Sequence, residues 1–254
     1  MLKKILLDEI YKNYVLEKKY IKKRIKKISF FKIMKRKKIE FKKKSLLIAE
    51  KKEFSPFIGL NRKFNIKRFK DIEKKRIFFF SKLTNSKFFS GNLYKENGLF
   101  LRKDFITDYC QVLFTLIYDY KYVLLIRKIF SFEKLKNLCK VTKFLGMVPL
   151  IELDKAIEIK KIIEKKIKNI LLGINSRNLK KFKIYKRNSI LNIKKKEKII
   201  YESGISNRNE MIKINNIGFK ITLVGENLTK NNFYYEKNSE IYKKKNRFNK
   251  KDKK

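Results

Sequence analysis

Short apolar runs of strand length recur along the chain and alternate with longer charged stretches. The charged stretches show helical spacing at 66–75, 132–145, 154–168 and 207–216. The apolar runs, rich in Ile, Val, Leu and Phe, cover residues 45–50, 76–81, 99–105, 122–126, 147–153, 169–174, 198–203 and 220–226. With the strand ends taken at 50, 81, 103, 126, 152, 175, 202 and 225, the strands follow one another at intervals of 22 to 31 residues, which suits one strand plus one crossover helix. The pattern therefore predicts eight strand–helix units.

Strands that are apolar throughout are typical of a parallel sheet with both faces covered by helices. Eight such units favour an α/β fold of the TIM (β/α)8 barrel type over residues 45–240. A doubly wound open sheet is the alternative, but its usual glycine-rich first turn is missing. We expect residues 1–44 to form an N-terminal helical extension that caps the barrel or borders its mouth. The basic tail at 241–254 is expected to be disordered.

Composition excludes several kinds of chemistry. The 254 residues contain no histidine, which removes nucleophile systems and metal sites that depend on imidazole. Proton transfer must then use Glu, Asp, Lys or Tyr. The eight glycines lack the spacing of dinucleotide-binding or P-loop motifs, and two cysteines are too few for a structural zinc site.

The formal charge of +45 would suit a nucleic-acid binder. Lysine is spread over the whole chain together with Ile, Asn, Phe and Tyr, so a nucleotide bias of the genome explains the excess better than a specific nucleic-acid partner. No apolar run approaches the roughly 18 residues of a membrane span, and the first residues include acids that a signal peptide would lack. We expect a cytoplasmic protein without membrane contact.

Polar residues stand at the predicted carboxyl ends of most strands. Active sites of such barrels lie at this end, so carboxylates and amines from different strands should converge on one mouth. Opposite charges held close together shift each other's pKa and supply an acid and a base without histidine. These strand-end residues are Glu50, Lys52, Lys103, Asp104, Glu152, Asn175, Arg177, Glu202 and Ser203.

Two glycines end the last two strand units. Gly204 follows the seventh strand, and Gly225 stands at the end of the eighth, just before a short helix expected to start at 226–227. Backbone N–H groups in these two loops commonly bind a phosphate in barrels of this type. We therefore expect a phosphorylated small molecule as substrate.

Six ordered segments closely resemble the indole-3-glycerol phosphate synthase family of tryptophan biosynthesis, over about residues 1–229. The most specific is IAEKKEFSPFIGL at 48–60. The others are LTNSKFFSG (83–91), LRKDF (101–105), INSRNL (174–179), ESG (202–204) and LVGENL (223–228). The sequence departs from the family pattern at Asn85, at Leu153–Asp154 and at Glu226.

The resemblance implies ring closure of a carboxyphenylamino-deoxyribulose phosphate with loss of carbon dioxide and water, and it implies no cofactor or metal. It assigns Lys103 as general acid and Glu152 as the base that assists dehydration. Lys52 would pair with the substrate carboxylate, and Glu50 would hold the lysines. Asn175 and Glu202 would orient the substrate and the intermediate.

The same resemblance assigns the remaining substrate contacts. Arg177 would add positive charge, and Ser55 belongs to the family's Ser-Pro turn. An apolar slot for the anthranilate would be lined by Pro56, Phe89 and Phe105. The phosphate would lie against Ser203, Gly204, Gly225 and Glu226.

Two alternatives remain open at this point. A phosphosugar isomerase of the same fold would share Gly204 and Gly225 but would not need Glu50, Lys52 and the Ser55 turn. A catalytically inactive barrel that binds polyanions would be expected to have lost some of the strand-end residues. We expect a monomer, and the sequence leaves association with other tryptophan-pathway enzymes open.

Overall fold

The computed structural model describes residues 46–51, 54–55, 59–60, 77–86, 90–95, 98–176, 193 and 195–229. The predicted extension at 1–44, the tail at 241–254 and the predicted helix at 66–75 lie outside these residues.

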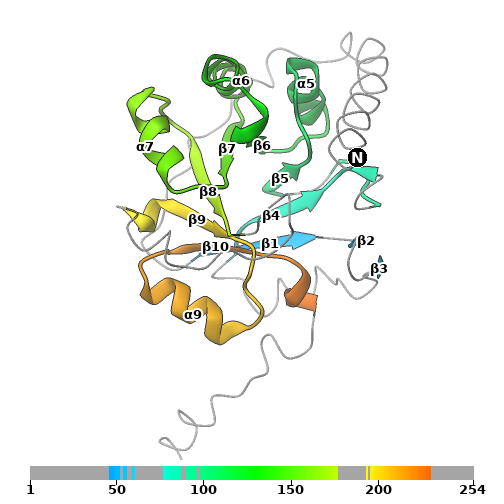
Figure 1. Cartoon of the computed structure of the whole chain (residues 1–254). Helices are drawn as coiled ribbons and strands as arrows, with labels where there is room; N and C mark the ends of the chain where they lie inside the picture. Colours follow the sequence, from blue (N-terminus) through cyan, green and yellow to red (C-terminus); the bar gives the residue numbers. More distant parts are fainter. Residues whose placement is uncertain are drawn as a thin grey trace, which may run out of the picture.

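Eight parallel strands close into a barrel (Figure 1). Around the barrel their order is β1, β10, β9, β8, β7, β6, β5 and β4, and pairing of β4 with β1 completes it. All eight predicted strands are confirmed, and closure excludes the open-sheet alternative. The strands are β1 (Leu46–Lys51), β4 (Ile77–Leu83), β5 (Phe100–Lys103), β6 (Tyr122–Ile126), β7 (Val148–Leu153), β8 (Leu171–Asn175), β9 (Ile199–Glu202) and β10 (Ile221–Val224).

A small antiparallel pair follows β1, which the apolar pattern does not predict. It consists of β2 (Phe54–Ser55) and β3 (Gly59–Leu60), with Phe54 paired to Leu60 and Ser55 to Gly59. Strands of two residues are too short to show a periodic pattern. The backbone of Ser55 therefore lies in a short strand, a few residues beyond the end of β1.

In the described part of the chain, four helices lie outside the strands (Figure 1): α5 (Tyr109–Ile117), α6 (Phe132–Phe144), α7 (Ile157–Glu164) and α9 (Arg208–Asn216). The predictions for α6, α7 and α9 are confirmed, with α7 shorter than expected. Asp108, Ser131 and Asn207 cap α5, α6 and α9 by accepting a backbone N–H. Single 3-10 turns are η2 (Arg127–Ile129), η3 (Lys196–Lys198) and η4 (Glu226–Thr229), the last at the predicted helix start.

Helix α5 is not singled out by the sequence pattern. Its residues, YCQVLFTLI, contain no charge and resemble an apolar strand run. Gln111, Val112, Thr115 and Leu116 are buried with Phe114, because this helix packs against β5 on one side and α6 on the other. Burial on two sides removes the polar face on which helical periodicity depends.

Side chains alternate along each strand between the inside of the barrel and the helices. The inside cluster includes Ile48, Leu101, Leu150 and Ile200, whereas the outside cluster includes their neighbours in sequence, such as Leu47 and Ile151. With a period of two, the next inward positions on these strands are 50, 103, 152 and 202. The alternation that fills the barrel with apolar side chains therefore aims four charged residues at one mouth.

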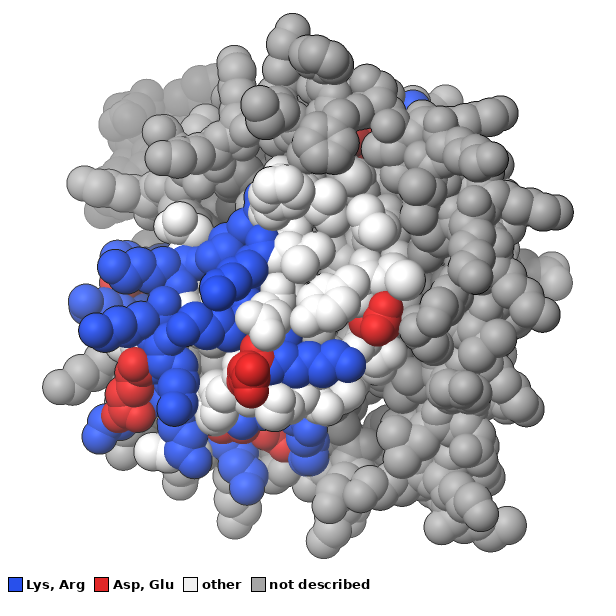
Figure 2. All heavy atoms as spheres, turned by 90° about the horizontal axis from the view of Figure 1, so that it is seen from above, with Lys and Arg blue, Asp and Glu red and all other residues white. Residues whose placement is uncertain are grey.

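Lysine dominates the outer surface. Figure 2 shows Lys and Arg side chains gathered beside an uncharged area of one face. No helix among the described residues is long and apolar enough to cross a membrane. On α6, α7 and the turns that follow β7 and α7, the exposed lysines are Lys134, Lys136, Lys140, Lys155, Lys160, Lys161, Lys165, Lys166 and Lys168.

Candidate active site

Five polar side chains gather at the carboxyl ends of the strands, where the alternation places them. Each comes from a different strand, and each follows apolar residues that fill the barrel. Four of them are at least 91% buried by residue surface, so most of the group is shielded from water. This strand-end cluster consists of Glu50 (β1), Lys103 (β5), Glu152 (β7), Asn175 (β8) and Glu202 (β9).

Lys103 is the central member of the cluster. Its Nζ lies 3.1 Å from Glu50 Oε2 and 3.1 Å from Glu202 Oε2, and it donates a hydrogen bond to the latter. Asn175 donates from Nδ2 to Glu152 Oε1 at 3.1 Å. The ammonium therefore lies between two carboxyl groups that are distant in the sequence. Glu50 precedes Lys103 by 53 residues, and Glu202 follows it by 99.

The surroundings of Lys103 favour its charged form. Burial alone would lower the pKa of the ammonium, but attraction by Glu50, Glu202 and Glu152 outweighs burial and raises the pKa above its ordinary value. Lys103 therefore carries a proton throughout the neutral range. It can donate that proton only to a group whose basicity rises during a reaction.

The surroundings of Glu202, in contrast, favour its uncharged form. Burial raises its pKa to about 8, the charge of Lys103 counteracts this, and Glu152 and Glu50 add to the rise. Three carboxyls face one ammonium among the described residues, so the most buried carboxyl keeps a proton near neutrality. The cluster thus contains a permanent cation, carboxylates and a titrating acid within one pocket.

The raised pKa of Glu202 predicts a pH-dependent contribution to stability. The pKa of a glutamate is about 4.3 in the unfolded chain and about 8 at position 202 of the folded chain. Between these two pH values the folded chain therefore holds more protons at Glu202 than the unfolded chain does. This contribution to stability is fully present below about pH 4.3 and is lost as the pH rises through about 8. We expect Glu202→Gln to remove this loss.

The measurement is the melting temperature of parent and variant between about pH 5 and about pH 9. The difference, variant minus parent, should rise with pH because only the parent loses stability at Glu202. Glu164→Gln is the matched control, since Glu164 lies exposed on α7. A Glu202→Gln difference as constant with pH as that of the control would contradict the assignment.

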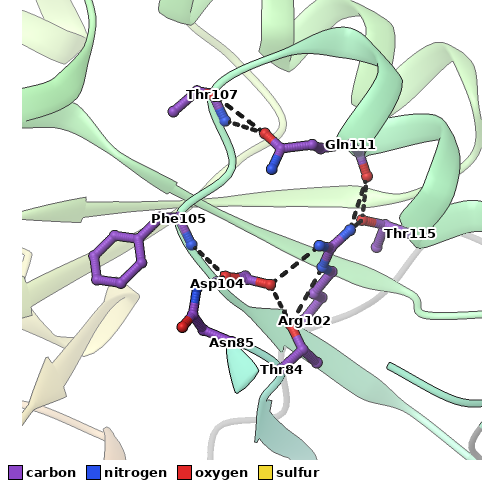
Figure 3. Close-up of polar contacts among 8 residues, drawn as sticks. All are labelled: Thr84, Asn85, Arg102, Asp104, Phe105, Thr107, Gln111 and Thr115. Carbon is purple, nitrogen blue, oxygen red and sulfur yellow. Dashed lines mark hydrogen bonds and ion pairs between the residues drawn. The ribbon is translucent and has the colours of Figure 1, made fainter. Parts of the chain in front are cut away.

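A second polar network surrounds Arg102 and Asp104, the two neighbours of Lys103 in the sequence (Figure 3). Arg102 is fully buried and donates from Nη2 to Asp104 Oδ2 at 3.1 Å, from Nε to Thr84 Oγ1 at 3.3 Å, and from Nη1 to the carbonyl of Gln111 and to Thr115 Oγ1. Asp104 accepts further hydrogen bonds from Thr84 Oγ1 at 2.6 Å and from the backbone N–H of Phe105 at 2.8 Å.

This network joins β4, β5 and α5 at the point where Lys103 leaves the barrel wall. Asp104 was expected at the mouth with the other strand-end residues, but it faces Arg102 instead. The period of two explains the difference, because neighbours of an inward Lys103 must point outward. Asn85, which also reaches Asp104 at 3.4 Å, belongs to the same network.

Two loops, which follow β9 and β10, lie at the same mouth, where the sequence predicts a phosphate site. Ser203 and Gly204 both have positive φ, at 69° and 74°, and the Ser176 hydroxyl donates to the carbonyls of Glu202 and Ser203. Asn227 in η4 donates to the carbonyl of Ile205 at 2.8 Å, which ties the loop after β10 to the loop after β9. Sequence reasoning missed Ser176, whose only signal is its place directly after Asn175.

The other predicted residues fall in three groups. Phe105 packs against the cluster of side chains inside the barrel, as a residue lining the mouth should. Gly225 precedes η4, and Glu226 begins it, in the loop expected to bind phosphate. Lys52, Pro56, Phe89 and Arg177 lie outside the described residues, as does the side chain of Ser55. Within the described part of the chain, no three His, Cys, Asp or Glu residues form a metal-binding group.

Comparison with known proteins agrees with this geometry. A model of the indole-3-glycerol phosphate synthase family matches residues 3–240. Synthases of that name from Campylobacter hominis, Campylobacter jejuni and Aquifex aeolicus are 32%, 34% and 33% identical to this chain. The matches cover 73%, 71% and 72% of this chain and 75%, 74% and 76% of the relatives. The chain belongs to the indole-3-glycerol phosphate synthase family.

Proposed function

We propose that the strand-end cluster closes an indole ring on a phosphorylated anilino-ketose, 1-(2-carboxyphenylamino)-1-deoxyribulose 5-phosphate. The observation that carries the proposal is the position of Lys103 Nζ, 3.1 Å from the carboxyl groups of both Glu50 and Glu202 at the carboxyl ends of the strands. The product is indole-3-glycerol phosphate, with carbon dioxide and water released. This is the activity named for the family and for its relatives.

Lys103 acts as the general acid in the first step. The ring carbon that bears the carboxylate attacks the ketone carbon, and the ketone oxygen, as it gains charge, takes a proton from the ammonium. The raised pKa of Lys103 keeps that proton in place until the oxygen becomes basic enough to accept it. A buried ammonium also stabilises the developing oxyanion more than an exposed one would.

Glu152 acts as the base in the later steps. Carbon dioxide leaves with the carbon–carbon bonding electrons returned to the aromatic ring, and the new hydroxyl then departs as water after a second proton transfer. Removal of a substrate proton by Glu152 forms the remaining double bond. Asn175 holds this carboxylate by its hydrogen bond to Oε1, and with Glu202 it orients the substrate and the intermediate.

The remaining roles concern binding. Glu50 holds Lys103, and Lys52 is proposed to pair with the substrate carboxylate, with Arg177 adding positive charge. Ser55, Pro56, Phe89 and Phe105 are proposed to enclose the aromatic ring. The phosphate would contact the loops of Ser203, Gly204, Gly225 and Glu226, whose geometry is supported by positive φ at 203 and 204. A cytoplasmic monomer stays a prediction of the sequence.

The test supplies the anilino-ketose phosphate to the purified full chain and follows indole fluorescence. We expect product without an added cofactor or metal, and with the chelator EDTA present. Absence of product from a folded chain would overturn the proposal. Interconversion of a phosphorylated ketose and aldose without indole formation would favour the isomerase alternative, whereas no reaction at all would favour an inactive barrel.

A further inference from the structure

Glu202 occupies space that only a glycine on the neighbouring strand leaves open. Gly173 lies in β8, paired with Ile200 of β9 and Glu152 of β7. A Cβ atom built at Gly173 would lie 1.9 Å from Glu202 Oε1 and 3.0 Å from its Cδ. The separation of 1.9 Å is far below any contact between unbonded atoms, so a side chain at 173 and the present position of the Glu202 carboxyl exclude each other.

Glu50 shows the same relation to a second glycine. A Cβ built at Gly225, which follows β10, would lie 2.6 Å from Glu50 Oε1 and 3.3 Å from its Cδ. Both carboxylates that contact Lys103 therefore rest against a glycine of an adjacent strand. Each glycine therefore limits a different one of the two partners of Lys103.

Backbone conformation does not explain either glycine. Gly98, Gly146, Gly204 and Gly218 have positive φ, where glycine is favoured, but Gly173 and Gly225 do not. A glycine inside a strand weakens it and often marks a close approach by another group. At Gly173 the only other neighbour of the built Cβ within 3.4 Å is Leu150 Cδ1, at an ordinary contact distance. The close approach is therefore that of the Glu202 carboxyl.

We propose that Gly173 is a positioning residue for Lys103, which acts by leaving the space in which the Glu202 carboxyl lies, and that Gly225 does the same for Glu50. The proposal rests on the role assigned above to Lys103. Neither glycine is proposed to move a proton in this role. Gly173 fixes where Oε2 of Glu202 meets the ammonium, and so fixes the direction in which Lys103 points.

The two oxygens of Glu202 support this arrangement. Oε2 accepts from Lys103 Nζ, while Oε1 is buried beside Gly173 and has no hydrogen-bond partner among the described residues. An alanine at 173 would push Oε1 out of its place and rotate or shift the whole carboxyl. The contact with Lys103 would then be lost or lengthened, and misplacement of a catalytic group by about 1 Å can cost about a hundredfold in rate.

The first test compares Gly173→Ala with the parent chain. We expect kcat to fall by about a hundredfold while KM stays within about threefold, because the substrate-binding loops are unchanged. Gly218→Ala is the matched control: Gly218 follows α9, has a φ of +116°, and meets nothing closer than Lys196 at 3.4 Å. It should lose stability through backbone strain but keep its kcat. A Gly173→Ala kcat within twofold of the parent would overturn the proposal.

A second readout does not depend on activity. The charged groups that face Glu202 are Lys103 on β5, Glu152 on β7 and Glu50 on β1. Displacing the carboxyl from its buried place should remove the loss of melting temperature with rising pH, as Glu202→Gln does, whereas Gly218→Ala should keep it. If the parent forms no indole but Gly173→Ala flattens this dependence, the proposed function fails and the positioning role stands. An unchanged dependence would refute the positioning role.

If Gly173→Ala does not fold, a double variant tests whether the collision with Glu202 is the cause. Shortening Glu202 to alanine removes the atoms that collide with the new side chain. Gly173→Ala/Glu202→Ala should then fold with a melting temperature close to that of Glu202→Ala. Failure of this double variant to fold would mean that Gly173 is needed for some other reason, and the proposal would be abandoned.

Discussion

Replacing Lys103 with methionine is expected to slow indole formation by roughly a hundredfold or more, with little change in KM. Methionine keeps the length of the side chain and removes its charge and protons. The ketone oxygen then gains charge without the ammonium of Lys103, while Glu50 and Glu202 lose the cation that both contact at 3.1 Å. The decrease in rate should appear in kcat, because the interaction between the ammonium and the ketone oxygen strengthens as the oxygen becomes negative.

Single-turnover fluorescence of parent and variant measures this effect. Lys136→Met is the matched control, since Lys136 lies exposed on α6 away from the strand ends, and it should keep the parent rate. The melting temperature of each variant shows that the chain is folded at the assay temperature. Equal rates for the parent and Lys103→Met would refute the assignment of the general acid.

Replacing Asp104 with alanine is expected to lower the free energy of unfolding by about 3–5 kcal/mol. The change takes from the guanidinium of Arg102, whose side chain is 0% exposed, a carboxylate partner at 3.1 Å. It also removes the acceptor for Thr84 and for the backbone N–H of Phe105. A buried charge that loses its partner costs far more than a broken pair on the surface.

Urea denaturation of the parent and Asp104→Ala measures the loss. Asp108→Ala provides a matched control in the same region, because Asp108 caps α5 by accepting from the N–H of Cys110 at 2.9 Å. A lost cap of this kind costs about 1 kcal/mol. If both aspartates cost the same, the network in Figure 3 does not stabilise the end of β5 as argued.

Much of the fold follows from the sequence, because apolar residues recur with the periods typical of strands and of amphipathic helices. Apolar runs give the strands, and charged amphipathic stretches give α6, α7 and α9. A period of two then carries the inward face from Leu101 to Lys103 and from Ile200 to Glu202. The convergence of these residues needed no more than parallel strands of matched length in a closed barrel.

Other features could not be predicted because they depend on contacts between distant residues. Asp104 accepts a hydrogen bond from Thr84, 20 residues earlier in the chain, and no local pattern shows this contact. Gly173 looks like a weak point of an apolar strand until the carboxyl of Glu202 is seen beside it. The pKa of Glu202 depends on Lys103, Glu50 and Glu152 together, and no single one of these neighbours determines it.

The four charged members of the strand-end cluster divide evenly between the two halves of the chain. A fragment cut after β6 would carry Glu50 and Lys103, and the remainder would carry Glu152 and Glu202. Neither piece alone contains both the proposed acid and the proposed base. The titration of Glu202 near pH 8 should therefore appear only when the two pieces reassemble, which makes it a natural reporter of complementation between separately produced half-barrels.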